Sequence, residues 1–164
     1  MTVYWLDADA CIQAKDEING AFPFSRMRPF WDYLSLQVDN GVVRAPKMVY
    51  DEIVKGNDEL SDWFSEREDR GLAIYASKEV HECASRIGDY VVEKYGDRLA
   101  RPFLKGADMW VMAHAMAMGT DGVVVTHETT RPLTAIIKIP AVCSAFGIER
   151  FTIFRMLNQL GARF

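Results

Sequence analysis

Residues 3–10 of the chain, VYWLDADA, join a short apolar run to two acids that are separated by one alanine. An uninterrupted run of apolar strand-forming residues is typical of a strand that is buried on both faces. We therefore expect a strand over Val3–Leu6, then a turn that carries Asp7 and Asp9, and then a helix that includes Cys11. A buried strand that ends in two carboxylates calls for an explanation beyond packing, because buried charges are costly.

The same order of strand and then helix recurs along the chain. Because strands that alternate with helices form a parallel sheet covered on both faces, we expect an α/β fold of three layers, α/β/α, with a mostly parallel central sheet. At 164 residues, 49% of them hydrophobic, the chain can bury a substantial core, and we expect a single domain over residues 1–164. Further strands are expected at 42–45, 72–75 and 122–125, near 151 and, as a strand or turn, at 136–139; further helices at about 30–38, 46–56, 58–69, 78–95, 106–119, from 140 and at 156–160.

Composition excludes several classes of protein. The formal net charge of −4 argues against a general nucleic-acid coat, and three widely spaced cysteines without a CxxC pair indicate neither a disulfide framework nor a zinc site. No run approaches the roughly 18–20 apolar residues of a membrane span, and the N-terminus lacks the features of a signal peptide. We expect a cytoplasmic protein that does not enter membranes.

Acidic residues follow two of the predicted strands. The carboxyl ends of parallel strands lie at one edge of the sheet, where α/β proteins bind ligands, so Asp7, Asp9 and Glu128 should meet there. Asp121 precedes its strand and should lie at the opposite edge.

Two helices should bring further acids to this edge. In MVYDEIV, helical periodicity puts Glu52 beside the buried stripe and turns Asp51 away from it. In KGADMWVMAHAMAMG, Asp108 lies in the first helical turn, where the helix dipole favours a carboxylate. His114, farther along this helix, is expected on its surface.

Carboxylates gathered in this way would repel one another unless a cation joined them. Asp7, Glu52, Asp108 and Glu128 come from four separate segments, and such a cluster normally holds a hard divalent ion. A set of ligands made of oxygen atoms favours Mg²⁺ or Mn²⁺ over zinc.

The order of VYWLDADACIQA, PKMVYDEIVKG, KGADMWVMAHAMAMG and GVVVTHE resembles that of the PIN-domain nucleases, and the size of the chain is similar to that of compact VapC-type toxins and their PIN-like relatives. The resemblance covers nearly the whole length. The first-strand acid of that family matches Asp7, its helical Glu matches Glu52, and the Asp that opens a later helix matches Asp108. The family's Thr-x-acid pair matches Thr126 and Glu128, although Asp is more usual at the latter position.

The resemblance implies a metal-dependent endoribonuclease, the toxin of a toxin–antitoxin pair, that hydrolyses single-stranded or structured RNA. Asp7 and Asp108 would be the main ligands of Mg²⁺ or Mn²⁺, Glu52 and Glu128 would complete the site directly or through waters, and Asp9 and Thr126 would orient these ligands. We also expect a cognate antitoxin and a homodimer. Basic residues that flank the acids in sequence are candidates for contact with phosphates: Lys105, Arg131 and Lys138.

Two other functions stay open. Asp7 and Asp9 also fit the Asp-x-Asp of a haloacid-dehalogenase-type phosphatase, but there a Thr or Ser precedes the Lys and the acidic pair, whereas Lys105 and Asp108 precede Thr126. A second alternative is a binding module that keeps the PIN-like fold without catalysis.

Overall fold

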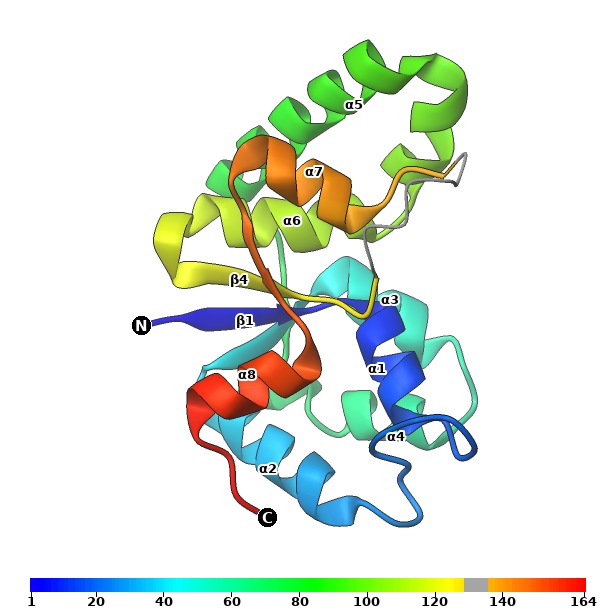
Figure 1. Cartoon of the computed structure of the whole chain (residues 1–164), viewed down its shortest axis with the longest axis vertical. Helices are drawn as coiled ribbons and strands as arrows, with labels where there is room; N and C mark the ends of the chain where they lie inside the picture. Colours follow the sequence, from blue (N-terminus) through cyan, green and yellow to red (C-terminus); the bar gives the residue numbers. More distant parts are fainter. Residues whose placement is uncertain (129–135) are drawn as a thin grey trace.

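The computed structural model describes residues 1–128 and 136–164. Its centre is a five-stranded sheet with the strand order β3-β2-β1-β4-β5, in which each pairing of the described strands is parallel (Figure 1). This confirms the α/β class and the parallel sheet. The strands are β1 (Val3–Leu6), β2 (Val43–Pro46), β3 (Ala73–Ile74), β4 (Gly122–Val125) and β5 (Glu149–Phe151).

Helices cover both faces of the sheet. In Figure 1, α5, α6 and α7 lie above the sheet, whereas α1, α2, α4 and α8 lie below it. No helix of the described residues is long and apolar enough to cross a membrane. The helices are α1 (Ala8–Lys15), α2 (Arg28–Asp39), α3 (Lys47–Val54), α4 (Glu59–Ser65), α5 (Lys78–Lys105), α6 (Asp108–Ala117), α7 (Ile139–Phe146) and α8 (Ile153–Leu160), with short 3₁₀ turns η1 (Glu68–Arg70) and η2 (Gly119–Asp121).

Strand β1 occupies the middle of the sheet, which explains its uninterrupted apolar sequence. All four of its residues are buried, and it pairs with β2 on one side and β4 on the other. Leu6 lies opposite Val125 in the β1–β4 pair. The next residues of both strands, Asp7 and Thr126, therefore leave the sheet side by side.

Three segments differ from the expectations. Helix α1 begins at Ala8, ahead of Cys11, so Asp9 belongs to its first turn. Helix α5 does not end near Tyr95: at Gly96 the backbone takes φ 80°, a left-handed value that glycine adopts easily, and a second helical limb continues to Lys105. Residues 136–138 form no strand, and α7 begins at Ile139.

Helix α6 is enclosed between α5 and the sheet and is buried on nearly all sides. His114 is therefore not on a helix surface as expected: it is only 3% exposed, and its ring lies 4.4 Å from that of Trp5, between ring centroids. Burial lowers the pKa of His114 to about 4, with a smaller contribution from His81. His114 is thus a neutral core residue at physiological pH.

Gly122 allows the backbones of α6 and β4 to approach each other closely. A Cβ atom at this position would overlap the carbonyl group of Ala115, which belongs to helix backbone and cannot rotate away. Any larger residue would force α6 and β4 apart.

We predict that Gly122→Ala lowers the free energy of unfolding by about 3 kcal/mol, the upper part of the range for overpacked cores. Urea denaturation followed by circular dichroism measures this change. Gly106→Ala is the matched control, because its Cβ would meet its nearest neighbours at 3.7 Å, an ordinary contact. Equal stability of the two variants would contradict the prediction.

Candidate functional site

Asp7 is a buried carboxylate at the carboxyl end of β1. Only 3% of the residue is exposed, and its backbone N–H donates to the Val125 carbonyl oxygen at 3.0 Å, which extends the β1–β4 pairing by one residue. Although Asp7 is the N-cap residue of α1, its side chain makes no capping hydrogen bond. The carboxylate instead accepts a hydrogen bond of 2.9 Å from the Thr126 hydroxyl.

The segment after β4 is held by a chain of hydrogen bonds. The Thr126 hydroxyl oxygen accepts from the backbone N–H of Glu128 at 3.1 Å, and the Glu128 carboxylate accepts from the backbone N–H of Ile139 at 2.9 Å. The other Glu128 carboxylate oxygen lies 3.6 Å from the Lys138 ammonium. Glu128 thus ties the end of β4 to the start of α7, a role that its position in the sequence did not reveal.

Burial and neighbouring acids act together on Asp7. Burial and, to a smaller extent, the charge of Asp108 raise the pKa of Asp7 to about 7. The Thr126 hydrogen bond opposes this rise, while Glu128 and Asp9 add smaller repulsions. A carboxylate with its pKa near neutrality is a common feature of functional sites.

Asp108 stands in a similar environment at the start of α6. The pKa of Asp108 is raised to about 6. Burial is the largest cause, and repulsion from Glu128 and Glu52 adds to it. Lys138 lowers this pKa, and Asp9 adds a small repulsion. The acids of α1, α3 and the segment after β4 therefore lie close enough for their charges to act on Asp7, Asp108 or both.

The two neighbouring acids of α3 differ in their surroundings. Glu52 is exposed to solvent rather than set beside the buried stripe, but its charge acts on Asp108. Asp51 is half-buried and its carboxylate lies 2.7 Å from the Lys47 ammonium. Asp121 belongs to η2, which precedes β4, and so lies at the opposite edge of the sheet.

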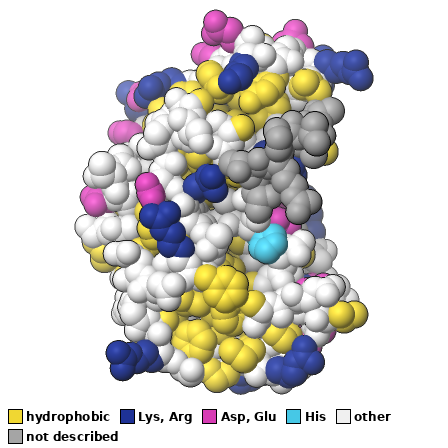
Figure 2. Space-filling view, viewed as in Figure 1, with side chains coloured by type: hydrophobic (Ala, Val, Ile, Leu, Met, Phe, Trp, Pro, Cys, Tyr) yellow, Lys and Arg dark blue, Asp and Glu magenta, His cyan; other side chains and the backbone are white. Residues whose placement is uncertain are grey.

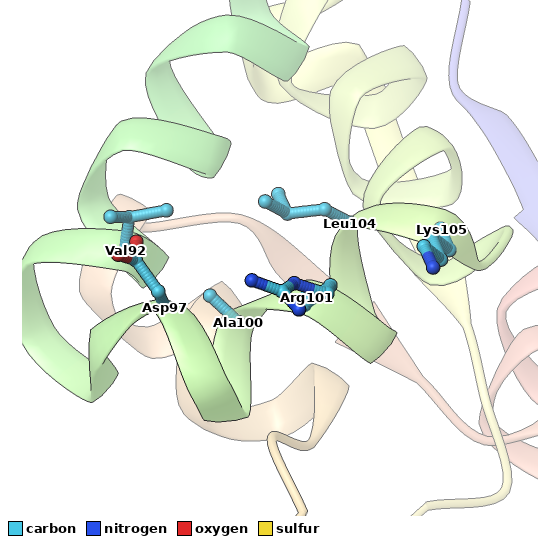
Figure 3. Close-up of a pocket in the computed structure, with 6 residues that line it drawn as sticks. All are labelled: Val92, Asp97, Ala100, Arg101, Leu104 and Lys105. Carbon is cyan, nitrogen blue, oxygen red and sulfur yellow. The ribbon is translucent and has the colours of Figure 1, made fainter.

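The three predicted phosphate-binding residues have different positions. Lys138 lies among the acids, paired with Glu128. Lys105 lines a pocket of about 240 Å³ inside the bend of α5, together with Asp97 and Arg101 (Figure 3). Arg131 lies outside the described residues.

The carboxylate oxygens of these acids are suitable ligands for a hard cation, but the acids are too far apart for three of them to bind one ion directly. Among residues 1–128 and 136–164, no three Asp, Glu, His or Cys side chains are arranged so that they could hold one metal ion. Mg²⁺ commonly keeps several of its waters and takes only one or two carboxylates from the protein. Asp7, which is buried, and Asp108, which is half-buried and whose charge raises the pKa of Asp7, are the pair that fits this mode of binding.

Cys11 lies near the acids but does not suit nucleophilic catalysis. Its side chain is buried, and burial together with the charges of Asp7 and Asp9 raises the pKa of the thiol. Because a thiolate is the reactive form, Cys11 is inert at neutral pH.

Comparison with known proteins identifies a family. Residues 4–164 match the family described as a domain of unknown function, DUF4411. The chain belongs to the DUF4411 family. No curated protein matches it.

Solved structures share the fold of this DUF4411 protein. One is the crystal structure of VapBC2 from Rickettsia felis bound to a DNA fragment from their promoter, with 14% identity over 83% of this chain and 96% of that chain, and a TM-score of 0.53. Another is VapBC-1 from nontypeable Haemophilus influenzae, with 13% identity over 92% of this chain and 98% of that chain, and a TM-score of 0.55. At this identity the likeness establishes the fold, which is PIN-like as the sequence motifs implied.

We predict that Asp7→Asn raises the melting temperature of the metal-free protein more at pH 8 than at pH 5. The folded-state pKa of about 7 lies above the ordinary value of 3.8, so the ionised carboxylate destabilises the fold above pH 7. That cost disappears as the pH falls from about 7 towards 4. Calorimetry in EDTA measures the melting temperatures of the wild type and of Asp7→Asn.

His114 affects stability in the opposite direction as the pH falls, but it does so equally in the wild type and in Asp7→Asn, so the comparison removes its effect. Its lowered pKa makes both proteins less stable as the pH falls from about 6.5 to 4. Asp121→Asn serves as control, because this exposed acid lies at the other edge of the sheet. If Asp7→Asn raised the melting temperature equally at both pH values, ionisation of Asp7 would not destabilise the folded protein, and the prediction would be wrong.

Proposed function

We propose that this DUF4411 protein is a divalent-metal-dependent endoribonuclease that acts in the cytoplasm as the toxin of a toxin–antitoxin pair. The observation that carries the proposal is the pair of acids Asp7 and Asp108 at the carboxyl edge of a PIN-like sheet, where burial raises the pKa of both and the charge of Asp108 also raises that of Asp7. Proteins rarely keep buried carboxylates together without a cation to offset their charge.

Each acid has a role in this proposal. Asp7 and Asp108 hold Mg²⁺ or Mn²⁺, which supplies an activated water and offsets negative charge on the scissile phosphate. Glu52, exposed on α3, and Glu128 complete the site through waters. Thr126 fixes the orientation of the Asp7 carboxylate through its 2.9 Å hydrogen bond, and Asp9 contributes from the first turn of α1.

Substrate and partners follow from the same reasoning. Lys138 is the basic residue best placed to contact an RNA phosphate, because its charge already acts on Asp108. The fold shared with two VapBC structures supports a cognate antitoxin as partner. A second copy of the chain remains the expected partner in a homodimer.

We predict that cleavage of single-stranded RNA disappears in EDTA and returns with Mn²⁺ or Mg²⁺. Asp7→Ala and Asp108→Ala should each lower the cleavage rate by at least about 100-fold, since each removes a main ligand. Water attack should leave a 5′-phosphate and a 3′-hydroxyl. Gel assays with end-labelled RNA and analysis of the product ends measure these outcomes.

The matched controls are Asp51→Ala and Asp121→Ala, which should retain activity within about twofold because they lie away from Asp7 and Asp108. Cleavage that persists in EDTA and yields 2′,3′-cyclic phosphate ends would refute the metal site. Turnover of p-nitrophenyl phosphate without cleavage of RNA would favour the phosphatase, and metal binding without either activity would favour the binding module.

We also predict that Mg²⁺ or Mn²⁺ raises the melting temperature, by the equivalent of about 2.7 kcal/mol at a concentration 100 times the dissociation constant. Asp108→Asn should reduce this response and also stabilise the metal-free protein, because it relieves repulsion of Asp7. Thermal unfolding with increasing metal measures both effects. An unchanged metal response in Asp108→Asn would remove Asp108 from the site, and Asp121→Asn should respond like the wild type.

A further inference from the structure

A pocket of about 470 Å³ adjoins the candidate site. It is enclosed by α1, the segment between α1 and α2, the residues after β4, and the start of α8. Thr126 belongs both to the wall of this pocket and to the candidate site, where its hydroxyl donates to Asp7 at 2.9 Å. The pocket is therefore the immediate neighbour of the carboxylates at the carboxyl edge of the sheet.

Aromatic rings form the apolar part of this pocket. Phe22 and Phe154 both line it, with 5.5 Å between their ring centroids. Phe22 is buried, whereas Phe154 is 59% exposed, so its ring has no cover from the described residues over much of its surface. Hydrophobic side chains gather on the lower half of the face in Figure 2, where Figure 1 has α2 and α8.

The polar part of the pocket consists of amide, imidazole and hydroxyl groups. They belong to Gln13, Asn19, His127 and Thr152, and no Asp, Glu, Lys or Arg is among the described residues that line the pocket. Such a lining suits a neutral, flat group with hydrogen-bonding edges, and it offers nothing to a phosphate or a metal ion. The volume lies within the usual range of small-ligand pockets.

We propose that this pocket binds one unstacked base of the single-stranded RNA substrate, next to the scissile phosphate. The inference rests on the proposed function, which makes RNA the substrate. Single-stranded bases are recognised by stacking on aromatic rings and by hydrogen bonds to their edges, and the pocket offers both. An apolar side chain of a partner protein would use the phenylalanines but would leave the amide and imidazole groups without partners.

The pocket then sets a base preference at one position beside the cleavage site. Contacts to phosphate carry no sequence information, so the acids and Lys138 can position any RNA. Hydrogen bonds from Gln13, Asn19 and His127 to a base edge distinguish one base from another.

The test measures binding of RNA separately from cleavage. Fluorescence anisotropy in EDTA would follow a labelled single-stranded oligonucleotide and a series in which each base in turn is replaced by an abasic site. Phe154→Ala should weaken binding of the intact oligonucleotide about 5- to 150-fold, as expected for the loss of one base–aromatic stack. At one position, an abasic site should weaken binding to the wild type by a similar factor. The same abasic site should weaken binding to Phe154→Ala by no more than about twofold.

Tyr75→Ala is the matched control, because Tyr75 is 74% exposed and is not among the residues that line the pocket. It should change binding less than about twofold. Both substitutions remove an exposed ring, and equal melting temperatures of the two variants would show that folding is not the cause of any difference.

Several outcomes separate this inference from the proposed function. If the wild type cleaves RNA but Phe154→Ala and every abasic oligonucleotide bind as the wild type does, the base pocket is refuted and the nuclease stands. If the binding pattern holds without any metal-dependent cleavage, the base pocket is supported and the nuclease fails. If Phe154→Ala abolishes binding of a purified antitoxin while binding of RNA is unchanged, the pocket takes a protein side chain, which overturns the inference.

Discussion

The hydrogen bond between the Thr126 hydroxyl and the Asp7 carboxylate joins the ends of the two central strands, and the site depends on it. It exists because β1 and β4 pair in parallel with Leu6 opposite Val125, so the next residue of each strand leaves the sheet at the same point. The hydrogen bond also resists the rise in the Asp7 pKa that burial causes. A shift of one residue in the β1–β4 register would turn one of these side chains into the opposite helical layer.

Charge in the site is unbalanced, and Lys138 offsets part of it. Its ammonium lies 3.6 Å from the Glu128 carboxylate, and its charge lowers the pKa of Asp108 while burial and other acids raise it. Because Lys138 is partly exposed on a flexible side chain, this pairing is weak compared with a buried ion pair. Glu128 also accepts a hydrogen bond from the Ile139 backbone, so movement of its carboxylate would disturb the start of α7. Lys138 is consequently the more mobile partner when another cation or a phosphate approaches the acids.

Sequence patterns predicted those parts of the protein that depend on local periodicity. The alternation of strands and helices led to the parallel sheet, and from it to a common edge for Asp7 and Glu128. Thr126, whose hydroxyl donates to Asp7 at that edge, was indicated only by the family resemblance. The second limb of α5 was missed because it follows Gly96, whose left-handed backbone turns the chain and interrupts the apolar periodicity.

Long-range contacts had no local signal. The burial of His114 against Trp5 follows from α6 packing on β1, which periodicity within α6 alone does not report. Likewise, the hydrogen bond from Ile139 to Glu128 spans residues 129–138, so no spacing motif could indicate it. The pocket beside Thr126 draws its walls from four separate segments, and Phe22 and Phe154 come together through the packing of α8 near the segment between α1 and α2.

Thr126 separates two environments of opposite character, and this division limits what the edge of the sheet can bind. On one side lie carboxylates that repel one another and favour a cation; on the other lies a pocket whose described lining residues include no Asp, Glu, Lys or Arg. A purely ionic ligand would leave the phenylalanines exposed, whereas a purely apolar one would leave the acids uncompensated. A molecule that carries a phosphate and a flat neutral group within one residue of each other can satisfy both sides at once, provided that a divalent cation on the acids receives the phosphate. A nucleotide has this construction, so the contrast between the two sides of Thr126 is the physical basis of the proposed RNA substrate.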